Sequence, residues 1–114
     1  EKPVVTEDNT LNEVIMEITE KRLGISAVLN DRGLLTGVIT DGDLRRMLEK
    51  RDDLSGVKAS DIMSAGPKTV EGDALAVAAL DRMRKNNITQ LLVTKDGNYA
   101  GVIHLHDLIR EGLI

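Results

Sequence analysis

The 114-residue sequence contains no cysteine, no phenylalanine, no tryptophan and a single tyrosine, Tyr99. The absence of cysteine excludes disulfides, cysteine-ligated zinc sites and a thiol nucleophile. Single-stranded nucleic acid is usually bound by stacking bases on aromatic side chains, so this class of binding is excluded as well. The hydrophobic core must therefore be assembled from aliphatic residues and the four methionines.

Positive charge and long apolar runs are also scarce. Lys and Arg number 15 against 19 Asp and Glu, and the net charge of −4 has the wrong sign for a general DNA or RNA binder. The longest apolar run, Ala74–Leu80, is far shorter than the roughly 18 residues that a membrane span requires. Nothing near Glu1 has the pattern of a signal peptide. We expect a soluble, cytoplasmic protein that binds neither nucleic acid nor membranes.

An internal repeat organises the chain. The pattern Gly-x-x-x-Gly-Val-Ile-x-x-x-Asp-Leu-x-Arg occurs in residues 33–46 and again in residues 97–110. Upstream of it, Glu7 aligns with Glu71 and Leu11 with Leu75 at the same offset. A one-residue gap after these pairs, which is later compensated, aligns Ile25 with Ile88 and Leu29 with Leu92. We therefore divide the chain into repeat 1 (residues 1–54), a polar linker (55–68) and repeat 2 (69–114). Because half a chain is marginal alone, we expect the repeats to pack about a pseudo-twofold axis.

Each repeat is predicted to fold as β-α-β-β-α, which places the protein in the α/β (α+β) class. In repeat 1, apolar residues at helical spacing follow a capping Asn9 or Thr10. The expected elements of repeat 1 are the extended segment Pro3–Thr6, a helix from Leu11 to about Lys21, strands Ser26–Leu29 and Leu35–Thr40, and a helix from Asp41–Asp43 onward. Those of repeat 2 are Thr69–Val70, helix Ala74–Lys85, strands Gln90–Thr94 and Tyr99–His104, and helix Leu105–Glu111. The first helix of repeat 2 is apolar nearly all round, which predicts packing on two faces.

This order of elements, the repeated Gly-Val-Ile string and the linker sequence Asp61-Ile62-Met63 resemble a tandem pair of CBS domains. The strings Thr40–Arg46 and His104–Gly112 are similar to the C-terminal CBS pair of D-arabinose 5-phosphate isomerases of the KpsF/GutQ type. That resemblance implies a non-catalytic regulatory region of an enzyme whose active site lies in an N-terminal sugar isomerase (SIS) domain, absent from this sequence. The parent enzyme would interconvert D-ribulose 5-phosphate and D-arabinose 5-phosphate for Kdo and lipopolysaccharide synthesis.

The resemblance also implies a nucleotide site in a cleft between the repeats. A Thr or Ser and an Asp at the start of the second helix of each repeat contact phosphate and ribose in such pairs. A carboxylate accepts hydrogen bonds from a diol, and a hydroxyl with free helical N–H groups favours phosphate. Repeat 1 matches with Thr40 and Asp43, whereas repeat 2 keeps Asp107 but has His104 at the Thr position. The further candidates are Met63, Ser64 and Thr69, with Thr89 and Ser26 weaker ones.

Structural roles compete with these assignments. Both aspartates stand where a helix cap is needed, and Thr40 could simply be a strand residue. The arginines at positions 45, 46 and 110 are interpreted as solvated helix faces, and Gly37 and Gly101 as points of close backbone approach. Because His104 and His106 have no evident third ligand, we favour a role at the cleft or at a subunit interface over a metal site.

Two functional hypotheses remain at this point. In the first, the pair binds a nucleotide or nucleotide-sugar effector, such as CMP-Kdo or an adenine nucleotide, and regulates the attached isomerase domain. In the second, it is an oligomerisation module with a vestigial cleft, which assembles a homodimer or homotetramer. No cofactor, metal or catalytic residue is expected in either case.

Overall fold

The computed structural model describes residues 2–112 and divides into two compact units, Glu1–Pro67 and Lys68–Ile114. Both units have the predicted α+β character. Each unit is described by itself below. Within the described residues, no helix is long and apolar enough to cross a membrane.

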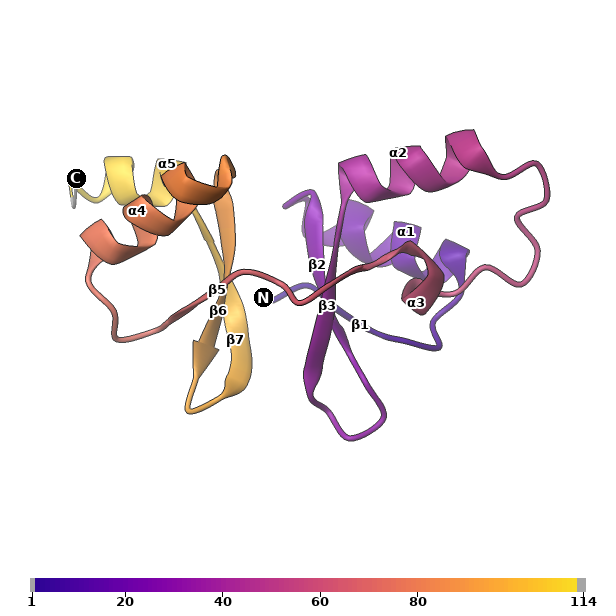
Figure 1. The fold of residues 1–114 in the computed structure, drawn as a ribbon, viewed down its shortest axis with the longest axis horizontal. Helices are drawn as coiled ribbons and strands as arrows, with labels where there is room; N and C mark the ends of the chain where they lie inside the picture. Colours follow the sequence, from indigo (N-terminus) through magenta and orange to yellow (C-terminus); the bar gives the residue numbers. More distant parts are fainter. Residues whose placement is uncertain (1, 113–114) are drawn as a thin grey trace. The chain divides into compact units, whose positions relative to one another are not determined.

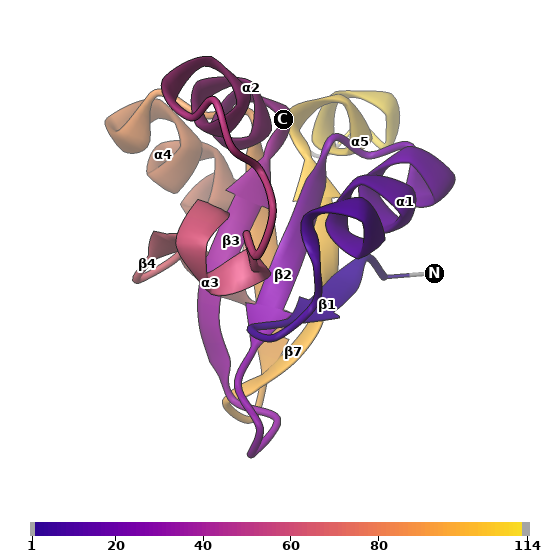
Figure 2. The same cartoon turned by 90° about the vertical axis from the view of Figure 1, so that its right-hand side faces the viewer.

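Unit 1 places helices on one face of a four-stranded sheet (Figures 1 and 2). The strand order is β1-β2-β3-β4, with β1 parallel to β2 and the other two pairings antiparallel. Its elements are β1 (Val4–Thr6), α1 (Leu11–Lys21), β2 (Ile25–Leu29), β3 (Leu35–Thr40), α2 (Asp41–Lys50), α3 (Ala59–Ile62) and β4 (Ser64–Ala65). Thr10 is the N-cap of α1, where its hydroxyl accepts a hydrogen bond from the backbone of Glu13.

Unit 2 repeats this arrangement with fewer elements. Its sheet has the order β5-β6-β7, and the helices again lie on one face of it (Figure 1). Its elements are β5 (Thr69–Glu71), α4 (Ala76–Asn86), β6 (Gln90–Lys95), β7 (Asn98–His104) and α5 (Leu105–Arg110). The parallel and antiparallel pairings match those of the first three strands of unit 1. The predicted β-α-β-β-α order is therefore present in both halves.

Each unit has its own aliphatic core, as the scarcity of aromatic residues requires. In unit 1, Val14, Val28 and Ile39 are fully buried between the sheet and the helices. In unit 2, the core is smaller and centres on Met83, Leu91 and Leu108. Burial of apolar surface of this kind is the dominant stabilising contribution to each unit.

The segment expected to act as a linker, residues 55–68, is a structural part of unit 1. Val57, Ala59 and Ile62 from this segment are buried in the core of unit 1, and β4 pairs with β3. We call residues 57–65 the covering arm. Its polar composition concealed this role, because only the few residues that face the core are apolar.

The strand registers correct our alignment of the upstream halves. Ile25 pairs with Thr40, and Gln90 pairs with the equivalent His104, so Ile25 corresponds to Gln90 and not to Ile88. Leu29 likewise corresponds to Thr94 rather than Leu92, since each directly follows a β-bulge. The alignment was wrong because the two hairpin turns differ in length, which the apolar pattern does not record.

The packing of α4 also differs from expectation. Its buried residues, Ala79 and Met83, lie on one stripe, whereas Leu75 and Val77 are 74% and 63% exposed. Leu75 stands before the helix as its N-cap residue and is not equivalent to the buried Leu11. The alanine-rich start of the segment made the helix look apolar all round, but alanine presents too little side chain to anchor a second face.

Glu17 joins α1 to β1 in a way that makes the stability of unit 1 depend on pH. Its Oε2 accepts hydrogen bonds from the Val4 backbone N–H at 3.0 Å and from Lys21 Nζ at 2.9 Å. Partial burial opposes ionisation, but these two partners outweigh it and hold the pKa of Glu17 below its ordinary value.

We expect Glu17→Gln to lower the free energy of unfolding of unit 1 by about 1 kcal/mol near neutral pH, because the amide keeps an acceptor but loses the charge. Since the pKa is lower in the folded state, this contribution is present above the unfolded-state value of 4.5 and is lost as the pH falls through the folded-state value. Urea denaturation at neutral and acid pH, followed through the signal of a backbone amide in unit 1, measures the difference in the free energy of unfolding between the native chain and the variant. A difference that stays constant with pH would contradict the assignment.

Candidate functional site

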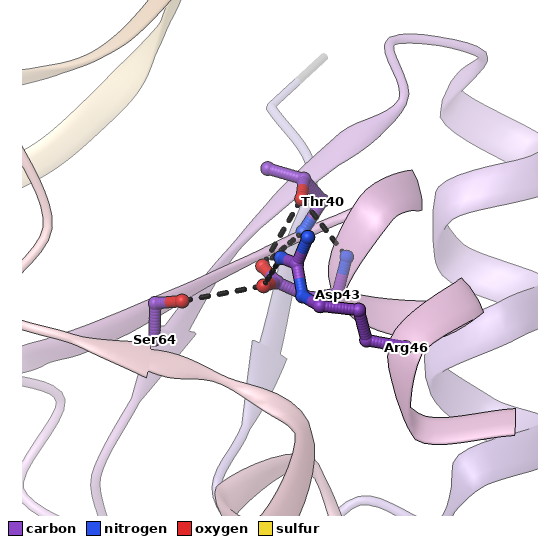
Figure 3. Close-up of polar contacts among 4 residues, drawn as sticks. All are labelled: Thr40, Asp43, Arg46 and Ser64. Atoms are coloured by element: carbon purple, nitrogen blue, oxygen red, sulfur yellow. Dashed lines mark hydrogen bonds and ion pairs between the residues drawn. The ribbon is translucent and has the colours of Figure 1, made fainter. Parts of the chain in front are cut away.

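The junction between β3 and α2 concentrates polar side chains around one carboxylate. Thr40 ends the strand, and its backbone N–H and hydroxyl donate to Asp43 Oδ2 at 2.9 and 3.1 Å. In return, the hydroxyl of Thr40 accepts from the Asp43 backbone N–H at 3.2 Å. This reciprocal capping box fixes the carboxylate at the first turn of α2 (Figure 3).

The other oxygen of this carboxylate has partners from two further elements. Arg46, one turn along α2, donates from its guanidinium to Asp43 Oδ1 at 2.5 Å. Ser64 Oγ, from β4 in the covering arm, donates to the same oxygen at 3.3 Å (Figure 3). The Asp43 side chain is only 7% exposed, while that of Arg46 is 60% exposed. Asp43 is thus a fixed acceptor, and Arg46 is a partner that can turn away toward water.

A cavity beside this carboxylate is lined by positive side chains. It has a volume of about 340 Å³ and lies entirely within unit 1. Arg46, Lys50 and Arg51 contribute three cationic groups to its wall, against the carboxylates of Asp43 and Asp61. Such a cavity can hold an anion next to a fixed hydrogen-bond acceptor.

The corresponding junction of unit 2 keeps the capping geometry with different chemistry. The His104 backbone N–H donates to Asp107 Oδ2 at 2.9 Å, and Arg110 donates to Oδ1 at 2.8 Å. His104 Nδ1 takes the place of the threonine hydroxyl, accepting from the His106 backbone N–H at 3.0 Å. The two imidazole rings are stacked, with centroids 4.9 Å apart. The Asp107 side chain, however, is 41% exposed.

The remaining predicted site residues occupy different surroundings. Met63 lies against Gly37, where a Cβ would come within 2.4 Å of its sulfur. Thr69 and Thr89 both lie in unit 2, and their carbonyl oxygens accept from Arg82 and from the Leu105 backbone N–H. Ser26 is fully buried, and its hydroxyl donates to the Ala27 carbonyl at 3.0 Å. The structure therefore brings Thr40, Asp43 and Ser64 together in unit 1, and His104 with Asp107 in unit 2.

Two features of these sites escaped sequence reasoning. Arg46 and Arg110 are mostly exposed, as their interpretation as solvated residues predicts, and each also forms an ion pair with an aspartate one turn earlier. The spacing of three residues on a helix was the available signal.

Among residues 2–112, the His, Asp and Glu side chains form no group of three that could hold a metal ion.

Comparisons with known proteins identify the family of this chain. A family model described as the CBS domain matches residues 1–50 and 59–113. The chain belongs to the CBS domain family. Over 94% of its length, this CBS pair superimposes with a TM-score of 0.84 and 27% identity on 82% of a CBS domain protein from Pyrobaculum aerophilum, which was solved in complex with AMP.

Curated relatives of this CBS pair are arabinose 5-phosphate isomerases named KdsD. The chain is 40% identical over its full length to the protein from Yersinia pestis and 35% identical to that from Escherichia coli K12. It spans 35% of the length of each. The predicted resemblance is confirmed, and the family matches account for nearly all of this region as a pair of CBS domains.

The two aspartates should differ in their importance for stability. We expect Asp43→Asn to lower the free energy of unfolding by about 2 kcal/mol, because a buried carboxylate with charged and neutral donors loses its charge. Asp107→Asn should cost less than about 1 kcal/mol, since its ion pair is exposed. Urea denaturation measures both, with a backbone amide reporting unit 1 and the fluorescence of Tyr99 reporting unit 2. Equal losses would show that the burial of Asp43 has no energetic consequence.

Proposed function

We propose that this CBS pair is the regulatory region of an arabinose 5-phosphate isomerase and that it binds a nucleotide or nucleotide-sugar. The observation that carries the proposal is the buried Asp43 carboxylate beside a cavity with three cationic side chains. A ribose and a phosphate need this combination of an acceptor and positive charge at adjacent positions.

The ribose is assigned to Asp43. Thr40 holds Oδ2 in the capping box, while the partners of Oδ1 are the exposed guanidinium of Arg46 and the hydroxyl of Ser64. A ribose diol supplies two hydroxyl donors that can replace these partners at Oδ1. The carboxylate keeps two hydrogen bonds in this exchange, while Arg46 and Ser64 are released to pair with other groups.

The phosphate is assigned to the neighbouring cavity. Once displaced from Asp43, the guanidinium of Arg46 can pair with an anionic oxygen instead, together with Lys50 and Arg51. The backbone N–H groups of the first turn of α2, a helix of ten residues, add to the favourable potential. Since Tyr99, the one Phe, Tyr or Trp residue, is buried, we expect a base at this site to pack mainly on aliphatic side chains.

Two ligand classes satisfy these requirements. The AMP complex of the Pyrobaculum aerophilum protein supports an adenine nucleotide. The similarity to arabinose 5-phosphate isomerases supports CMP-Kdo, because a feedback ligand of that route carries a ribose, a phosphate and an acidic sugar. In the parent enzyme, the pair would act in the cytoplasm on the catalytic SIS domain of the same chain.

A thermal-shift panel of AMP, ATP, CMP and CMP-Kdo tests the assignment. We expect at least one to raise the melting temperature by about 5 °C or more at tenfold excess over its Kd, because a ligand that binds only the folded state stabilises it. Asp43→Asn should abolish most of the shift, and the matched variant Asp107→Asn should keep it. No shift with any of the four, or an undiminished shift in Asp43→Asn, would refute the proposed site.

A second candidate function is assembly of copies of the chain. The observation that favours it is the exposure of large apolar side chains on helices, notably Met16 on α1 and Leu75 and Val77 at α4. Light scattering should give a dimer or tetramer for this chain and a smaller species for the double variant Leu75→Asp, Val77→Asp. A monomer at all concentrations, with ligand binding intact, would leave only the regulatory function.

A further inference from the structure

The helix α5 is capped by an imidazole, whereas α1 and α2 are capped by threonine hydroxyls. Nδ1 of His104 accepts a hydrogen bond from the His106 backbone N–H at 3.0 Å. A ring nitrogen accepts only through a free lone pair, so this hydrogen bond assigns the ring as neutral, with its proton on Nε2. The cap therefore exists in only one protonation state of His104.

The equivalent cap of unit 1 has no such restriction. The hydroxyl of Thr40 accepts from the Asp43 backbone N–H at 3.2 Å and donates to the Asp43 carboxylate at 3.1 Å. A hydroxyl keeps this ability between pH 5 and 8, the range in which histidine ordinarily changes its charge. The replacement of a threonine by His104 thus makes a structural contact of unit 2 depend on a proton.

The stacked ring of His106 belongs to the same neutral arrangement. The two imidazole rings are nearly parallel, with an interplanar angle of 4° and centroids 4.9 Å apart. Two imidazolium rings at this separation would repel each other. A positive charge at the N-terminus of a helix is also unfavourable, because the helix dipole is positive there. Acid therefore disfavours the stack together with the cap.

Asp107 offers the protonated ring a different partner in the same junction. Its Oδ2 accepts from the His104 backbone N–H at 2.9 Å, and its Oδ1 accepts from Arg110 at 2.8 Å. The Asp107 side chain is 41% exposed, so a third donor has access to it. An imidazolium Nδ1–H that can no longer accept from a backbone N–H can donate to this carboxylate instead.

The other elements packed at this junction supply no competing carboxylate among the described residues of unit 2 that face it. The residue opposite on β6 is the uncharged Gln90. On α4, Arg84 lines the cavity of about 360 Å³ that this helix shares with α5. The one acidic residue of α4, Asp81, is paired with Lys85. Asp107 is therefore the anionic partner of the protonated ring.

The helix that begins at this cap is short and carries part of the core of unit 2. It spans the six residues Leu105–Arg110, so its first turn makes up a large part of it. Leu108, which is 1% exposed, is its buried residue and packs in the core with Met83 and Leu91. Release of the cap loosens the first turn of the helix that holds Leu108 in place.

We propose that His104 is a proton-dependent helix cap that makes unit 2, but not unit 1, respond to pH. With a neutral ring, Nδ1 holds the first turn of α5. With a protonated ring, Nδ1 becomes a donor, releases the His106 backbone N–H and turns to Asp107, where it competes with Arg110. Imidazoles ordinarily change charge near about pH 6.5, so the change falls in the physiological range. This inference concerns the fold of unit 2 and does not depend on nucleotide binding.

Exchange of backbone amides with water tests the cap at the group that it protects. The protection of the His106 N–H is measured by NMR in the ligand-free chain, relative to an unstructured peptide at the same pH. We expect it to fall about tenfold from about pH 7.5 to about pH 5.5, because about one net hydrogen bond is lost. Protection of the Asp43 N–H, which Thr40 caps, should stay constant over this range.

Two variants separate the cap from the stacked ring. His104→Thr gives α5 the capping residue of unit 1, and the amides of its first turn should then be equally protected at both pH values. His106→Gln keeps the backbone N–H that is capped but removes the second imidazole. We expect this variant to retain most of the fall in protection.

Three results would overturn the proposal. The first is constant protection of the residue 106 amide in the native chain over the whole range. The second is an equal fall in His104→Thr, which would assign the response to another titrating group. The third is loss of the response in His106→Gln, which would place it in the stack rather than in the cap. All three concern unit 2 without ligand, so they are distinct from a failure of the proposed nucleotide site.

Discussion

The capping of a helix by the residues at the end of a strand is the interaction on which both candidate sites depend. In each unit an aspartate at the third helical position bonds back to the strand residue before the helix. This bond sets the angle between strand and helix, and it fixes a carboxylate at the helix N-terminus. The carboxylate that we propose as a binding group is thereby held in place by the same contact that stabilises the fold, so structural and functional roles of Asp43 are compatible.

The two repeats have diverged around this shared contact. Unit 1 surrounds its carboxylate with a threonine hydroxyl, a serine from the covering arm and a guanidinium. Unit 2 substitutes an imidazole nitrogen for the hydroxyl and leaves its carboxylate open to water. A hydroxyl can donate and accept at once, whereas the unprotonated Nδ1 of His104 only accepts. The pair is therefore chemically asymmetric despite its repeated fold.

Much of the fold was predictable from the sequence because strand and helix periodicities are local. The ends of β3 and the start of α2 at Thr40 and Asp41 follow directly from the pattern. The register of the first halves was not predictable, since it depends on hairpin lengths and bulges that leave no apolar signature. Thr40, Asp43 and Ser64 were predicted from the resemblance, and the three-residue spacing of Asp43 and Arg46 was a local signal, but the contact of Ser64 with Asp43 depends on the packing of β4 beside α2.

The packing of the covering arm on unit 1 has a consequence for the order in which the chain can fold during synthesis. Unit 1 lacks part of its core until Ile62 has left the ribosome, although all the residues of repeat 1 have by then been made. The boundary between the two compact units at Pro67 therefore falls inside the segment 59–113 that matches the CBS family model. A truncation placed at the end of repeat 1, at residue 54, would remove the covering arm and with it the fourth strand of unit 1.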